Sequence, residues 1–190
     1  MPSPHLHRLD PPDRPSGLVL MLHGGQSKSH EPVDQRSASW LRSRWMQHQI
    51  VDRAHAQGAA LWLLRFQRRG WNAGAGPVPS PVPDAQWALE EARRELGELP
   101  VVLLGHSMGA RTAVAVADDS SVSGVVALAP WLPADEPVRP LTGKRLAAAH
   151  GRADKITSFR ATETFVRRAG SVASLMKPSP KRLATRKSSQ

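Results

Sequence analysis

The chain has 190 residues, with 26 Lys or Arg against 16 Asp or Glu and no cysteine. This length suits a single domain with a sizeable core, and no apolar run approaches the ~18 residues that cross a bilayer. The absence of cysteine excludes disulfides, cysteine-ligated metal sites and thiol catalysis.

The net charge of +10 is concentrated in the C-terminal quarter of the chain. Residues 1–143 hold 14 basic and 14 acidic side chains, whereas residues 144–190 hold 12 basic side chains against Asp154 and Glu163. A neutral body with a basic end is not the composition of a domain-wide nucleic-acid-binding face. We therefore expect residues 177–190 to form a basic, disordered tail with at most weak, salt-sensitive binding to phosphates.

The first third of the chain predicts two strands separated by a helix. Residues 1–16 are polar and rich in proline, which predicts an irregular lead-in. The continuous apolar run 18–22 suits a central strand of a parallel sheet. After a polar loop at 26–39, apolar residues recur on one face of a helix predicted at 40–57. Residues 59–66 form a second strand candidate.

The rest of the chain continues the alternation of helix and strand. The glycines and prolines of residues 70–83 predict a loop, after which Asp84 can cap a helix that ends at Gly97. Further strands are predicted at 101–104, 122–129 and 146–149, with another candidate at 171–176. Apolar spacing predicts two more helices, one with Ala110, Ala113, Val114 and Ala117 on one face and one at 159–169.

This alternation predicts the α/β fold class, with a mostly parallel sheet covered by helices on both faces. Ligands of such sheets bind at the carboxyl ends of the strands. The residues that follow the predicted strands are therefore the candidates for a functional site.

The third predicted strand is followed by Gly105-His106-Ser107-Met108-Gly109, a G-x-S-x-G pattern. A serine on a sharp strand-to-helix turn has strained backbone angles and close neighbours, so the positions two away must be small. The turn lifts the Ser107 hydroxyl above the sheet, and the Met108 N–H at the helix start points at a developing oxyanion. An apolar strand before the pattern and an alanine-rich helix after it make this a strong signal for a nucleophile.

With these motifs, residues 17–176 resemble the α/β-hydrolase superfamily, and in particular its small bacterial serine hydrolases. The segment His23-Gly24-Gly25 after the first strand resembles the oxyanion loop of that family. The resemblance implies that the Gly25 backbone N–H, next to Gln26, completes the oxyanion hole and that His23 braces the loop. Residues 69–72 also resemble the small bacterial members, and the resemblance implies that they line the entrance at most.

The acid of the triad is expected after the fifth strand. His150-Gly151-Arg152-Ala153-Asp154 resembles the H-G-x-x-D segment of the family, which implies that Asp154 is the acid and orients the catalytic histidine. Asp135 and Glu136 are alternatives, because some family members place the acid after the fourth strand. A helix cap or surface turn is the structural alternative for Asp154.

No histidine follows His150, although the family places the catalytic base after the last strand. His106 neighbours Ser107, but adjacent residues on such a turn are expected to point apart. We expect His150 to be structural, and only His30 could swing toward the site. The remaining histidines lie in the lead-in or on the first helix, at His5, His7, His48 and His55.

The sequence therefore supports two predictions of function. The first is a serine hydrolase that acts on a carboxylic ester or related acyl substrate. The second is a catalytically impaired hydrolase remnant, with a truncated or frame-altered C-terminus and a binding role or none, because loss of the histidine alone costs a serine protease about 10⁶ in kcat. We expect a small-molecule acyl substrate, no cofactor or metal, no membrane partner, no nucleic-acid partner beyond weak binding by residues 177–190, and a cytoplasmic location.

Overall fold

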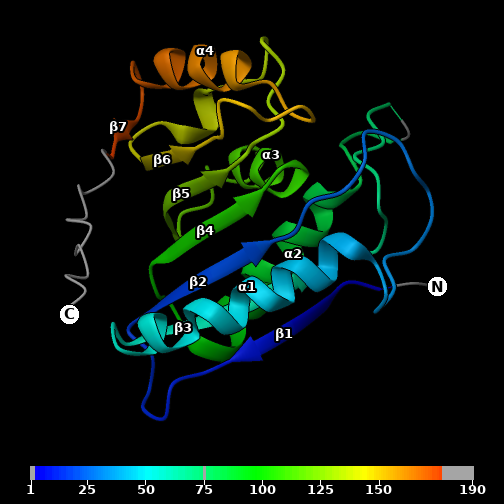
Figure 1. Cartoon of the computed structure of the whole chain (residues 1–190). Coiled ribbons are helices and arrows are strands. Elements are labelled where there is room, and N and C mark those ends of the chain that lie inside the picture. Colours follow the sequence, from blue (N-terminus) through cyan, green and yellow to red (C-terminus); the bar gives the residue numbers. More distant parts are fainter. Residues whose placement is uncertain (1–2, 75, 177–190) are drawn as a thin grey trace, which may run out of the picture.

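The computed structural model describes residues 3–74 and 76–176, which contain a seven-stranded sheet in the order β1-β3-β2-β4-β5-β6-β7 (Figure 1). Strand β1 pairs with β3 in the antiparallel direction, and every other pair is parallel. The strands are β1 (His5–Leu9), β2 (Gly17–Leu22), β3 (Ala59–Arg65), β4 (Val101–His106), β5 (Val122–Leu128), β6 (Arg145–Ala149) and β7 (Ser174–Leu175).

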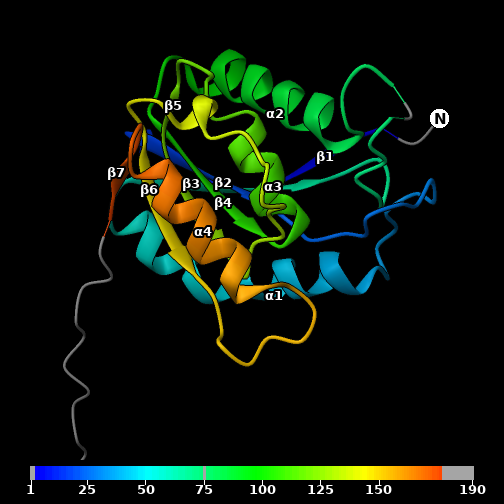
Figure 2. The same ribbon diagram turned by 90° about the horizontal axis from the view of Figure 1, so that it is seen from above.

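Helices cover both faces of the sheet. They are α1 (Ala38–His55), α2 (Pro81–Leu96), α3 (Met108–Ala115) and α4 (Phe159–Ala169), with a 3₁₀ turn η1 (Arg139–Leu141) before β6. Helix α1 lies on one face, and α2 and α3 lie on the opposite face (Figure 2). Helix α4 lies beside β6 and β7, at the end of the sheet away from β1 (Figure 1). The predicted α/β class, with a mostly parallel sheet, is confirmed.

The central strands are buried on both sides, which explains their continuous apolar sequences. Residues 60–64 of β3 are all buried, and so are Leu20, Met21 and Leu22 at the end of β2. Removing this apolar surface from water contributes roughly 25 cal/mol per Å². The central strands are therefore a rigid platform for the loops at their carboxyl ends.

Strand β1 corrects the prediction of an irregular lead-in. Residues 5–9 pair with β3 from His5 opposite Arg65 to Leu9 opposite Leu61. Only Leu6 of this strand is buried, so the apolar signal that marks the central strands is missing. The limits proposed for the hydrolase domain therefore begin too late to include the edge strand. Residues 177–190, predicted to be a disordered tail, lie outside the described residues.

Helix α2 starts at Pro81, four residues earlier than the helix that the sequence predicted after Asp84. Pro81 occupies its first turn, where a missing N–H costs no intrahelical hydrogen bond. Asp84 is therefore not a cap: its carboxylate accepts hydrogen bonds from the Gln67 backbone N–H at 2.8 Å and from the Gln67 side-chain amide at 2.6 Å. The contact joins α2 to the segment after β3. Within the described ranges, no helix is both long and apolar enough to span a bilayer.

Candidate active site

Ser107 lies on a strained turn between β4 and α3. Its backbone angles are φ 53° and ψ −116°, a region that non-glycine residues rarely adopt and that costs about 1–3 kcal/mol. A Cβ at Gly105 would overlap the backbone of Ala110, and one at Gly109 would overlap the carbonyl of Leu22. The two glycines of the motif are thus required by close packing of α3 against β4 and β2.

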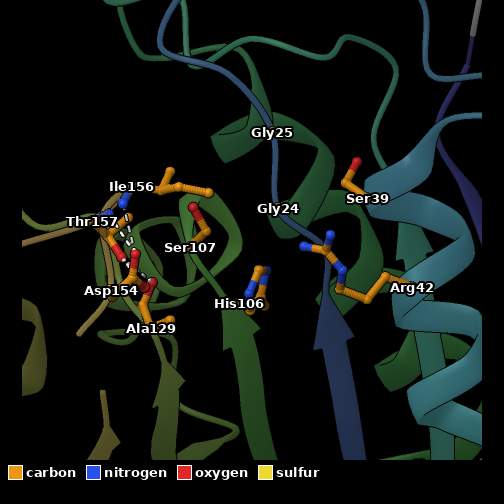
Figure 3. A pocket seen from close by; sticks show the side chains of 10 residues that line it. All are labelled: Gly24, Gly25, Ser39, Arg42, His106, Ser107, Ala129, Asp154, Ile156 and Thr157. Carbon is orange, nitrogen blue, oxygen red and sulfur yellow. Dashed lines mark hydrogen bonds between the residues drawn. The ribbon is translucent and has the colours of Figure 1, made fainter. Parts of the chain in front are cut away.

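The carboxyl ends of β2, β4, β5 and β6 meet around one cavity of about 300 Å³ (Figure 3). Ser107, Gly25 and Asp154, three of the four residues that the sequence predicted for the site, line this cavity. The other residues that line it are Gly24, Ser39, Arg42, His106, Ala129, Ile156 and Thr157. The topology of the sheet therefore gathers segments that are more than 100 residues apart in the sequence.

The fourth predicted residue, Met108, is buried and lies directly against Gly25. A Cβ at Gly25 would overlap the Met108 thioether and the carbonyl of Arg69. The Met108 N–H belongs to the first turn of α3, where N–H groups have no intrahelical acceptor. The Gly25 N–H has no acceptor among the described residues, whereas the Gln26 N–H is taken by the Arg69 carbonyl at 2.8 Å. The geometry thus leaves Gly25, rather than Gln26, free to donate.

Asp154 is held by the loop that follows it. Its carboxylate accepts hydrogen bonds from the backbone N–H groups of Ile156 at 2.7 Å and Thr157 at 3.0 Å, and from the Thr157 hydroxyl at 2.9 Å. These bonds, with the Thr157 backbone N–H as the largest contribution, lower the pKa of Asp154 to about 2. Asp154 is therefore a fixed carboxylate at the wall of the cavity.

His150 lies behind this loop. Its Nε2 is 3.5 Å from Asp154 Oδ2 and 3.1 Å from the Thr157 hydroxyl, and its Nδ1 is 2.7 Å from the Thr162 hydroxyl. Its side chain is only 1% exposed, and it does not line the cavity. The imidazole thus connects β6 to α4, in agreement with the structural part that the sequence predicted.

His106 lines the same cavity as Ser107, but the two side chains make no hydrogen bond. Figure 3 shows the imidazole on the side of Arg42, while the Ser107 hydroxyl is turned toward Ile156. Burial is the largest cause that lowers the pKa of His106, and the charge of Arg42 lowers it further. His106 is therefore part of the cavity wall and makes no hydrogen bond to Ser107.

The other histidines lie away from Ser107. His23 is fully buried; its Nδ1–H donates to the Gly24 carbonyl at 2.6 Å, and its Nε2 accepts from the Phe66 N–H at 3.1 Å. His30, the histidine that the sequence suggested could turn toward the site, does not line the cavity. No histidine in residues 3–74 or 76–176 hydrogen-bonds to the Ser107 hydroxyl.

The alternative acids do not reach the site. Asp135 is exposed on the surface. Glu136 is 5% exposed and forms an ion pair with Arg111 at 2.6 Å. The Arg111 guanidinium lies 4.2 Å from the centre of the Trp71 ring and 4.7 Å from that of Trp131. Glu136 is thus part of a cation–π cluster next to the site, and Asp154 is the carboxylate that lines the cavity.

The sequence did not point to three polar side chains of the cavity, those of Ser39, Arg42 and Thr157. Ser39 and Arg42 project from α1 (Figure 3), and nothing in their local sequence distinguishes them from surface residues of that helix. Thr157 had a usable signal, because an Asp followed three residues later by Thr is a pattern of side-chain-capped turns. A second cavity of about 460 Å³, with Lys28 and Trp131 in its wall, also opens onto Ser107.

Residues 69–72 brace the loop that follows β2. They do not line the cavity, whose entrance was the most that the sequence assigned to them. The Trp71 N–H donates to the Gln26 carbonyl at 2.8 Å. The Asn72 side chain accepts from the Ser29 N–H at 2.9 Å and donates to the Ser29 carbonyl at 2.8 Å. None of the four residues lines either cavity at Ser107. Within residues 3–74 and 76–176, no group of three or more histidine or carboxylate side chains could hold a metal ion.

The sequence and the structure were both compared with known proteins. The sequence model of the alpha/beta hydrolase family matches residues 19–188. A comparison with curated protein sequences finds no match. The chain belongs to the alpha/beta hydrolase family, as its motifs predicted.

Solved structures share the fold at low sequence identity. An alpha-beta serine hydrolase homologue from Coxiella burnetii is 16% identical, with a TM-score of 0.63 over 91% of this chain and 81% of that one. Est1E from Butyrivibrio proteoclasticus, solved with ferulic acid bound, is 12% identical, with a TM-score of 0.63 over 91% and 84%. A putative alpha/beta hydrolase from Agrobacterium tumefaciens is 14% identical, with a TM-score of 0.65 over 90% and 76%.

Proposed function

We propose that the protein is a serine hydrolase that acts on a carboxylic ester or a related acyl substrate, with Ser107 as the nucleophile. The observation that carries this proposal is the strained turn that presents the Ser107 hydroxyl in an open cavity, beside the unpaired Gly25 N–H. Strain of this kind is retained where a function needs it.

In this reaction the Ser107 oxygen attacks the acyl carbon, and the alcohol leaves with a proton. Water then releases the acid from the acyl-serine and restores the hydroxyl. The Gly25 and Met108 N–H groups would stabilise the negative oxygen in both steps, an effect worth about 10²–10³ in kcat for each donor. The two cavities that Ser107 lines would take the acyl and alcohol parts.

The rate is expected to be low, because no described histidine contacts Ser107. Without a base the serine keeps an ordinary hydroxyl and is a weak nucleophile near neutral pH. The oxyanion donors and substrate binding alone still supply roughly 10³–10⁴ over water. A slow esterase is therefore the expected phenotype of the 190-residue chain.

The test is hydrolysis of p-nitrophenyl acetate, together with labelling by a fluorophosphonate probe. We expect Ser107→Ala to abolish both labelling and any rate above background. The exposed Ser171, at the end of α4, provides a matched control, and Ser171→Ala should behave like the parent. Equal rates in the parent and in Ser107→Ala would contradict the proposal.

A second candidate function is binding without turnover. The observation that favours it is the Asp154 carboxylate, whose hydrogen bonds go to its own loop and whose neighbouring imidazole, His150, is buried. In that case a short methyl ketone, as an unreactive ester analogue, would bind the parent and Ser107→Ala equally, and the fluorophosphonate would label neither. The substrate class, the cytoplasmic location and the weak phosphate binding of residues 177–190 stay predictions.

A further inference from the structure

A second group of charged side chains lies away from Ser107, between β1, β3 and the first turns of α1. It surrounds a cavity of about 430 Å³ lined by His5, His7, Gln35, Trp40, Leu41, Arg44 and Arg65. None of these residues is acidic. This cavity, called the edge cavity below, shares no lining residue with the two cavities at Ser107.

Two guanidinium groups face the same indole in the edge cavity. The Cζ atom of Arg44 lies 5.8 Å from the centre of the Trp40 ring, and that of Arg65 lies 5.9 Å from it. Among the described residues, neither arginine forms an ion pair, and the Nε–H of Arg44 is buried without an acceptor. The donors of both forks are therefore not used by the protein's own carboxylates.

The histidines of β1 add two more donors. His5 and His7 are two residues apart on a strand, so their side chains share one face, and the register places His5 opposite Arg65. The Gln47 side-chain amide donates to the carbonyls of His7 and Leu61, so its oxygen accepts from His7 Nδ1–H at 2.9 Å. This bond leaves His7 Nε2 free to bind a proton and then to donate.

Among the described residues, no acidic side chain lines the edge cavity or pairs with its two arginines. Burial is the largest cause that lowers the pKa of both histidines, and the charges of Arg65 on His5 and of Arg44 on His7 lower it further. Arg8, on the same strand, is paired with Glu95 at 2.7 Å. Like charges held together without a counter-ion favour an anion that brings its own negative charge.

We propose that the edge cavity binds the phosphate group of a small phosphorylated molecule. A dianionic phosphate presents enough oxygens to accept from two planar guanidinium forks and from protonated imidazoles, whereas one carboxylate presents only two. The volume exceeds that of a phosphate alone and lies in the range of small-molecule sites, about 300–1,000 Å³. The exposed side chain of Leu41 is an apolar wall for the organic part.

The test is a titration at constant ionic strength, followed by the NMR signals of the His5 and His7 rings. Inorganic phosphate and phenyl phosphate are the probes. We expect saturable shifts of both rings with each probe, and tighter binding of phenyl phosphate. Arg44→Gln and Arg65→Gln should each weaken binding at least tenfold, whereas Arg53→Gln, an exposed arginine near the end of α1, should leave it unchanged.

Three results would overturn the proposal. They are the absence of saturable shifts in the parent, equal loss of affinity in Arg53→Gln and Arg65→Gln, and full affinity in Arg65→Lys, which keeps the charge but removes the planar fork. If Arg65→Gln does not fold, Arg65→Lys takes its place as the variant that tests the role of the planar guanidinium.

Sulfate provides a separate test of the histidines, because it stays dianionic between pH 6 and 8. The groups that face His5 and His7 are Arg8, Arg44, Arg65 and His48, and none of them carries negative charge. A bound dianion would therefore raise the pKa of both histidines, and sulfate affinity should increase as the pH falls. A sulfate affinity that does not change with pH would contradict the role of His5 and His7 in the site.

Discussion

The Thr157 hydroxyl donates a hydrogen bond of 2.9 Å to the Asp154 carboxylate. The Asp154 oxygen that accepts this bond, Oδ2, lies 3.5 Å from His150 Nε2. In a complete triad the acid orients an imidazole that in turn contacts the serine. Here Thr157 lies next to Asp154, and the neighbouring imidazole of His150 is buried and does not line the cavity at Ser107.

Thr157→Val tests how much the hydroxyl contributes to the charge state of Asp154. The pKa of Asp154 should rise from about 2 but stay below 3.8, because the two backbone N–H bonds remain. The stabilising effect of this carboxylate is present above pH 3.8 and is lost as the pH falls toward 2. Carbon NMR titration of the side-chain carboxyl measures the change. Thr142→Val, at an exposed site, should leave it unaffected, and an unchanged pKa in Thr157→Val would contradict the role of the hydroxyl.

His23 makes stability depend on pH. Burial lowers its pKa from 6.5 to about 4, so the unfolded chain binds more protons than the folded protein in this interval. The free energy of unfolding should therefore fall as the pH drops from 6.5 to 4, by about 3 kcal/mol in total. Denaturant unfolding at several pH values measures the slope. His23→Gln should remove most of it, whereas the exposed His30→Gln should keep it; an equal slope in both variants would count against this assignment.

The strain at Ser107 predicts that a glycine variant is more stable than an alanine variant, the reverse of the order expected within a helix. With φ at 53°, a glycine there relieves a strain of about 1–3 kcal/mol and loses about 0.5–1 kcal/mol of chain entropy relative to alanine. Ser107→Gly should thus be more stable than Ser107→Ala by roughly 1 kcal/mol in thermal unfolding. In helix α1 the opposite order is expected, so Ser39→Ala should be more stable than Ser39→Gly. If the alanine variant were the more stable one at both positions, Ser107 would not be strained.

The ion pair between Arg111 and Glu136 predicts a strong coupling between two substitutions. Arg111→Met leaves the buried carboxylate without its partner and should cost about 3–5 kcal/mol. It should also raise the pKa of Glu136 further, because burial already raises this pKa and the charge of Arg111 opposes the effect. Replacing both residues by Met should recover most of the loss, as measured by denaturant unfolding. Additive effects of the two single changes would disprove the coupling.

Local sequence was sufficient for the elements that are buried or strongly periodic. The helix predicted at 159–169 matches α4, and the apolar runs became the central strands. Prediction from local sequence failed at β1, where Leu6 is the only buried residue. It also failed at the start of α2, where a cluster of prolines resembles a loop. An edge strand depends on pairing with a distant neighbour, which leaves no trace in its own pattern of apolar residues.

The sequence by itself determined the fold class, the turn at Ser107 and the segment that carries Asp154, because each depends on residues that are adjacent in the chain. Only the tertiary structure decided that Arg42 shares a cavity with Ser107, that Glu136 is paired with Arg111, and that the two histidines of β1 face two arginines. These contacts join residues 25 to 65 positions apart. Their geometry follows from the order of the strands and the packing of α1 and α3, which local patterns do not encode.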